Sequence, residues 1–72
     1  MAVNAYKFLK GSNVHCTSSF TGKNYSSFKA DAYYVFMGLD SEDDVQLGEY
    51  DGFGNVRRVG DCTPIEFSSH FE

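Results

Sequence analysis

Short apolar and polar stretches, broken by frequent turn signals, run along most of the chain. Turn-forming residues gather at residues 11–13, 21–24, 40–43, 51–55 and 60–64, and the segments between them are mostly six to ten residues long. Short segments with regular turn punctuation are typical of small all-β proteins. We therefore predict one domain over residues 1–72. Its predicted fold is a five- to six-stranded antiparallel barrel or sandwich.

Alternation of apolar and polar positions indicates the first strands. Residues 3–9 have an extended pattern, and residues 14–20 place Val14, Cys16 and Phe20 on one face. Further along, residues 45–50 and 56–59 flank a glycine-rich loop and predict a hairpin. After Pro64, the shared face of Ile65, Phe67 and Phe71 predicts a last strand.

Residues 25–39 fit two interpretations. A helical reading gathers Phe28, Ala32, Val35, Phe36 and Leu39 on one stripe. A strand over residues 30–39 is favoured, because Tyr33-Tyr34-Val35-Phe36 is rich in β-forming residues. The alternative is an α+β fold with one helix around residues 26–37 on a four- to five-stranded sheet. Phe36 lies on the apolar side in both readings and is predicted to be core, whereas Tyr33 lies outside both.

The aromatic content exceeds what a small core can hold. Seven Phe and five Tyr stand in 72 residues, and a chain of this size buries only ~60% of its unfolded surface. Some rings must therefore be exposed, and rigid aromatic and arginine side chains are favoured anchors of protein interfaces. A four-residue hairpin loop at 52–55 would place Glu49 opposite Arg58 and Arg57 beside Tyr50. We expect Arg57, Tyr50 and Phe53 to form a contact patch, with Tyr33 as a further outward ring.

Charge is unevenly distributed along the chain. Residues 1–36 carry four Lys and one Asp, a net charge of +3, whereas residues 37–72 carry two Arg and nine acidic residues, a net charge of −7. Clustered basic residues are missing, which disfavours direct nucleic-acid binding. We expect the acids of the 40–44 turn to be solvated, and the acidic residues of 40–51 to attract a basic partner surface or to imitate nucleic-acid phosphates. These residues are Asp40, Glu42, Asp43, Asp44, Glu49 and Asp51.

No pattern indicates a catalytic, metal or cofactor site. Residues 40–51 carry acids in the spacing of a calcium loop, but Val45 stands where that loop needs glycine. His15, Cys16, Cys62 and His70 are zinc-ligand types without a compact zinc spacing. We therefore predict a protein that is not an enzyme and has no cofactor and no metal.

The cysteines and the start of the chain indicate the compartment. We expect Cys16 in the core and Cys62 partly exposed, both as free thiols. The first residues do not read as a secretory signal, and the longest apolar run, residues 32–37, is too short for a membrane span. The expected location is the cytoplasm, which would be the host cytoplasm for a phage-encoded protein.

These observations predict a small acidic, non-enzymatic protein-binding module. It would inhibit or modulate a larger protein by occupying a basic surface, as short acidic phage inhibitors of host enzymes or defence systems do; the likeness is one of size and charge. The alternative is a structural virion or assembly protein that packs against identical or neighbouring subunits, since head-to-tail contacts suit the charge asymmetry.

Overall fold

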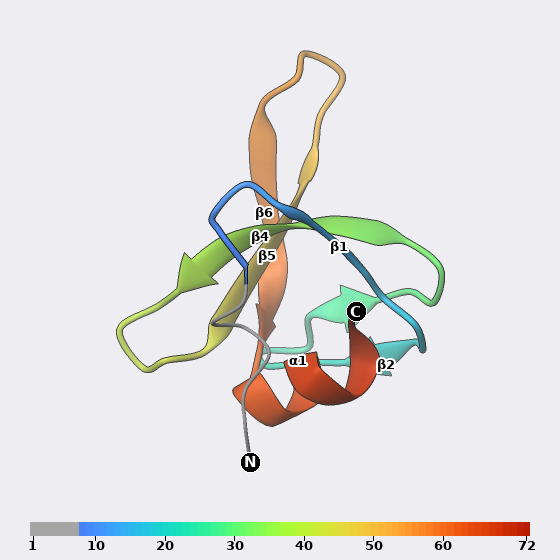
Figure 1. Ribbon diagram of the computed structural model, residues 1–72, viewed down its shortest axis with the longest axis vertical. Coiled ribbons are helices and arrows are strands. Elements are labelled where there is room, and N and C mark those ends of the chain that lie inside the picture. The colour runs from blue at the N-terminus through green and yellow to red at the C-terminus, as the bar shows by residue number, and fades with distance from the viewer. Residues whose placement is uncertain (1–7) are drawn as a thin grey trace.

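The computed structural model describes residues 8–72. Within them, strands β1, β4, β5 and β6 form one antiparallel sheet in the order β1-β4-β5-β6, and β2 pairs with β3 (Figure 1). The chain is therefore a small antiparallel β protein with one short helix. The elements are β1 (Asn13–His15), β2 (Phe20–Thr21), β3 (Ser27–Phe28), β4 (Tyr33–Leu39), β5 (Val45–Tyr50), β6 (Val56–Cys62) and α1 (Pro64–His70).

Strand β4 confirms the favoured reading of residues 30–39. Asp31 has a φ of 66° in the turn that precedes the strand. Phe36 is buried and Tyr33 is 67% exposed, as the sequence predicts. The helix of the alternative reading is present in the protein, but it lies at Pro64–His70 and not around residues 26–37.

The prediction of a C-terminal strand is wrong. Ile65 and Phe67 belong to α1, and Phe71 is its C-cap. Thr63 accepts a hydrogen bond from the Glu66 N–H, and the Glu66 side chain accepts one from the Thr63 N–H. This capping box, followed by proline in the first turn, starts a helix. Helical spacing puts Phe67 and Phe71 on one buried face and leaves Ile65 76% exposed.

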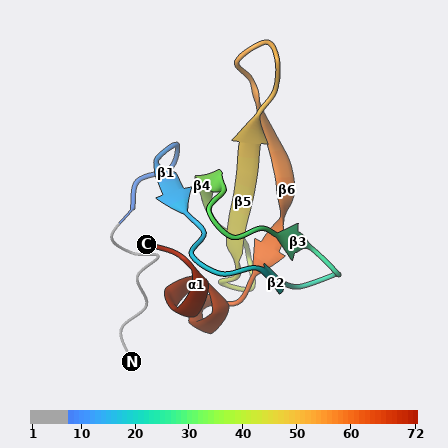
Figure 2. The same cartoon turned by 90° about the vertical axis from the view of Figure 1, so that its right-hand side faces the viewer.

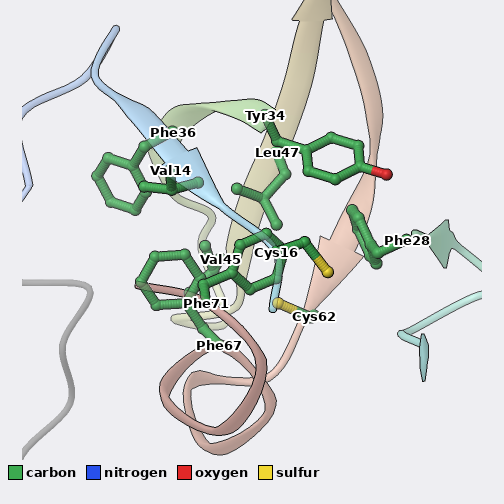
Figure 3. Close-up of a cluster of buried hydrophobic side chains, with 10 residues drawn as sticks. All are labelled: Val14, Cys16, Phe28, Tyr34, Phe36, Val45, Leu47, Cys62, Phe67 and Phe71. Carbon is green, nitrogen blue, oxygen red and sulfur yellow. The ribbon is translucent and has the colours of Figure 1, made fainter. Parts of the chain in front are cut away.

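The core lies between α1 and one face of the sheet (Figure 2). Leu47 and Phe36 are cross-strand partners on that face, and Phe67 and Phe71 face them from the helix (Figure 3). Ring contacts dominate the cluster: Phe67 stacks on Phe71 at 5.1 Å and Phe28 meets Phe71 edge-on at 5.8 Å. Aromatic side chains bury large areas, so they compensate for the small number of aliphatic residues.

The N-terminal predictions are met in part. The extended segment predicted at 3–9 lies outside the described residues, apart from Phe8 and Leu9. The alternation predicted over 14–20 holds at Val14 and Cys16, which are both buried. Strand β1 nevertheless ends at His15. Cys16 pairs instead with Phe71 in an isolated antiparallel β-bridge. The backbone N–H of the next residue, Thr17, donates a hydrogen bond to the carbonyl of His70 at the end of α1.

Candidate interaction surface

The β5–β6 hairpin extends beyond the rest of the fold (Figures 1 and 2). Every residue from 50 to 58 is exposed, and we call this segment the arm. Phe53 at its tip is 91% exposed and Tyr50 is 54% exposed. The pairing of β4 with β5 ends on this side at Val35 and Gly48, so the arm continues past the sheet as a two-stranded ribbon.

A three-residue loop, 52–54, presents Phe53 at the tip. The Asp51 N–H donates to the Asn55 carbonyl at 2.8 Å, and the Gly54 N–H donates to the Asp51 carbonyl at 3.3 Å. Gly54 has a φ of 83°, which completes a type I turn with a glycine bulge. The Asp51 carboxylate accepts hydrogen bonds from the N–H groups of Phe53 and Asn55. Asp51 therefore shapes the loop.

The predicted pairing of Glu49 with Arg58 is wrong, because the loop is one residue shorter than expected. Tyr50 lies opposite Val56, and Glu49 lies opposite Arg57. The register shifts between Leu47 and Gly48, which leaves Val59 as the extra residue of a bulge. Arg57 therefore does not share a face with Tyr50. Among residues 8–72, Arg57 makes no ion pair within 4.0 Å, whereas the Arg58 guanidinium lies 3.4 Å from Asp61.

A hollow lies beside the base of the arm, with a volume of about 300 Å³. Val35, Met37 and Val56 give it an apolar lining, and Lys10 stands at its side. Gly48 permits this packing, since a Cβ there would lie 2.7 Å from the Met37 sulfur. The hollow is wide enough to receive an apolar side chain from another molecule.

The acidic turn at residues 40–44 is more structured than the sequence suggests. The Asp40 carboxylate accepts hydrogen bonds from the N–H groups of Glu42 at 2.8 Å and Asp44 at 3.0 Å. Asp44 is buried, and its carboxylate bonds to the Lys23 ammonium at 2.6 Å. That hydrogen bond raises the pKa of Lys23. The expectation that all these acids are solvated is wrong at Asp44, and only Glu42 and Asp43 are exposed.

Tyr33 lies apart from the arm. Its ring stacks on His15 at 4.9 Å. The His15 imidazole also lies 3.5 Å from the Asp31 carboxylate and 3.6 Å from that of Glu72. No ring contact joins Tyr33 to Tyr50 in the part of the chain that the structure describes. The structure thus places Tyr50, Phe53 and both arginines on the arm, with Arg57 on the face opposite to Tyr50, and leaves Tyr33 and the acidic turn at separate places.

Both cysteines are free and fully buried, so the expected partial exposure of Cys62 is wrong. Burial raises the pKa of Cys62 to about 12, and it also raises the pKa of Cys16. Thiols in this state are neither nucleophiles nor metal ligands near neutral pH.

One side-chain pair has the separation of a nucleophile and a base. The Ser18 hydroxyl lies 2.7 Å from Nδ1 of His70. The His70 ring stacks on Phe20 at 4.1 Å. The His70 carbonyl accepts hydrogen bonds from both the backbone N–H and the side-chain hydroxyl of Thr17. No carboxylate contacts His70 among residues 8–72, so the pair lacks the group that orients the base in a catalytic triad. The contacts instead fasten the end of α1 to the segment after β1.

Two further features bear on function. Among the described residues there is no group of three or more His, Cys, Asp or Glu side chains that could hold a metal ion. Within the same residues no helix is long and apolar enough to cross a membrane. Comparison with protein-family models, curated proteins and solved structures finds no match.

Proposed function

We propose that this protein is a non-enzymatic protein-binding module whose main contact surface is the arm, residues 50–58. The observation that carries the proposal is the presentation of Phe53 and Tyr50 on a ribbon that stands clear of the core. Exposed hydrophobic rings beside arginines are the residue types that dominate binding energy at protein interfaces. The hollow beside Val56 offers a place for an anchoring side chain of the partner.

The partner in this proposal is a larger protein, and binding blocks one of its surfaces. The acidic turn adds a second, weaker contribution, because only Glu42 and Asp43 expose their carboxylates there, and Glu42 already lies 3.9 Å from the Lys23 ammonium. A basic region on the partner would therefore steer the encounter more than it would hold the complex. Assembly with identical or neighbouring subunits is the second candidate function, and the exposed apolar tip of the arm favours it.

The experiment is capture of partners by the immobilised protein from a lysate of the cell in which it acts. The double variant Tyr50→Ala/Phe53→Ala removes both rings, and Ile65→Ala is the matched control, since Ile65 is also a large hydrophobic residue, is 76% exposed and lies on α1, away from the arm. We expect wild type and control to retain the same stoichiometric partner and the double variant to lose it. Equal capture by all three proteins would refute the arm as the contact surface.

Light scattering of the purified protein separates the two candidate functions. A monomer at all concentrations supports binding to a different protein. Oligomers that dissociate in the Tyr50→Ala/Phe53→Ala variant would instead favour the assembly function, with the arm as the contact between subunits.

A further inference from the structure

Strand β6 lies at the edge of the sheet, and its N-terminal half, which belongs to the arm, has no neighbouring strand on the outer side. The C-terminal end of β6 is covered, because the Lys23 N–H donates to the Asp61 carbonyl and the Asp61 N–H donates to the Ser26 hydroxyl. Figure 2 shows β3 beside this C-terminal part of β6 and no other strand beside the arm. The uncovered part of the edge is residues 56–59, of which 56–58 belong to the arm and are exposed.

The hydrogen-bond pattern of the hairpin identifies which backbone groups of this edge are free. Asp51 and Asn55 form a bonded pair, and bonded and non-bonded pairs alternate in an antiparallel ladder. Arg57 therefore turns its N–H and carbonyl toward β5, while Val56 and Arg58 turn theirs outward. Among the described residues nothing receives these outward groups. They are a template for one more strand.

We propose that the open edge of β6 binds an extended acidic segment of a partner protein by strand addition. The inference rests on the proposed function and specifies how the arm would recognise its partner. Backbone hydrogen bonds to Val56 and Arg58 would hold the added strand, as in other cases of recognition by sheet edges. Arg57 would favour an acidic segment over a basic one, because its guanidinium makes no ion pair among residues 8–72 and is available to a carboxylate of the added strand.

A second copy of this chain fits the same edge poorly. The antiparallel register that uses both outward residues puts Val56 of one copy opposite Arg58 of the other. That register places Arg57 directly opposite Arg57 of the second copy, and like charges at directly opposed positions destabilise a strand pair. An acidic strand in the same place removes the repulsion and adds an ion pair, so charge selects a different protein as the occupant.

The test uses hydrogen exchange and amide chemical shifts of the full chain with a short peptide of alternating glutamate and valine. We expect the Val56 and Arg58 amides to exchange rapidly in the free protein and to become protected with the peptide, whereas the Arg57 amide is protected in both states. A peptide of alternating lysine and valine is the control and should give no protection. Unprotected Val56 and Arg58 amides at the highest soluble peptide concentration overturn the proposal, as does equal protection by the lysine peptide.

Two variants separate the backbone and charge contributions. Val56→Pro removes an outward N–H without removing a bond to β5, and proline is tolerated at such edge positions; Val56→Ala is its matched control. We expect the proline variant to lose peptide binding and the alanine variant to keep it, while Arg57→Ala weakens binding about two- to fivefold. Binding retained by Val56→Pro overturns strand addition. If Val56→Pro does not fold, the exchange experiment on the wild type decides alone.

Failure of strand addition can be distinguished from failure of the proposed function. Loss of a captured partner in Tyr50→Ala/Phe53→Ala, together with unprotected edge amides, would leave the arm as a contact surface and remove strand addition. Protection of the edge amides that rises with protein concentration alone would show a second copy as the occupant and overturn the proposal.

Discussion

Lys23 and Asp44 form the shortest ion pair among residues 8–72, with 2.6 Å between the ammonium nitrogen and a carboxylate oxygen. The pair joins the β2–β3 turn to the residue that precedes β5. Asp44→Asn should therefore lower the free energy of unfolding, because it removes the negative partner of Lys23 at a buried site. Asp43→Asn is the control, since Asp43 is exposed and asparagine accepts its φ of 64°.

Urea denaturation of the two variants measures this difference. The pKa of Lys23 is raised in the folded protein from 10.5, mainly by its hydrogen bond to Asp44. The stabilisation is therefore complete at neutral pH and is lost as the pH rises above 10.5. An Asp44→Asn variant as stable as Asp43→Asn at neutral pH would show that the pair contributes nothing.

Phe36→Ala should destabilise the protein by about 3–5 kcal/mol, because it leaves a cavity under the rings of Phe8 and Phe67. That loss is comparable to the whole stability of a small domain. Tyr33→Ala should change stability by about 0.5 kcal/mol, since the ring is exposed and touches only His15 among the described aromatic residues. Thermal melts of both variants check the contrast, and a stable Phe36→Ala variant would contradict the core assignment.

Thr63→Ala should cost about 1 kcal/mol by removing the hydroxyl that caps α1. For a domain of this size that corresponds to a fall in melting temperature of about 4–8 °C. Thr21→Ala on β2 is the matched control, because Thr21 is exposed and its hydroxyl makes no hydrogen bond in the described part of the chain. Equal melting temperatures for the two variants would argue against the capping box.

Both thiols should be unreactive toward a thiol reagent in the folded protein, and both should react after denaturation without prior reduction. Reductant should leave the melting temperature unchanged, because both cysteines are free. A large shift with reductant would indicate a bridge between Cys16 and Cys62.

The buried thiol of Cys62 also predicts a pH dependence of stability. In the unfolded chain the thiol ionises near pH 9.0, whereas burial raises the pKa in the folded protein to about 12. The folded state binds more protons between these values, so the free energy of unfolding should fall as the pH rises from 9 toward 12. Chemical denaturation across that range measures the slope, and Cys62→Ala should show a smaller one.

Glu42→Gln/Asp43→Asn should leave the fold intact, because both side chains are exposed. If the acidic turn steers a basic partner, the double variant should reduce the association rate and leave the dissociation rate nearly unchanged. Surface plasmon resonance with a captured partner, at low and high salt, measures both. An unchanged association rate would remove the acidic turn from the proposed function.

Local patterns in the sequence were sufficient for much of the fold. Strand β4 follows from Tyr33-Tyr34-Val35-Phe36, and the β5–β6 hairpin follows from two strand segments around a glycine-rich loop. The C-terminal helix was missed although Thr63 and Glu66 carry the spacing of a capping box. Weighing that signal above the alternation of Ile65 and Phe67 would have found the helix.

Other features depend on contacts that local patterns do not contain. The buried carboxylate of Asp44 bonds to Lys23, which lies 21 positions earlier in the turn between the paired strands β2 and β3. The hairpin register depends on whether the loop has three or four residues, a difference that moves Arg57 to the other face. Cys62 is buried by residues distant in sequence: it belongs to the core cluster with Phe28, and the β2–β3 turn passes so close that a Cβ at Gly22 would lie 3.2 Å from the Cys62 Cβ.

The separation of the arm from the core has a consequence for how this protein can change over generations. None of residues 50–58 belongs to the core cluster. Most substitutions that are rejected in small domains fail because they erode a narrow margin of stability. Replacements on the arm avoid that constraint, provided that Asp51 and Gly54 keep the loop. A lineage carrying this scaffold could therefore exchange one binding preference for another by changing a few exposed positions while its folding remained untouched.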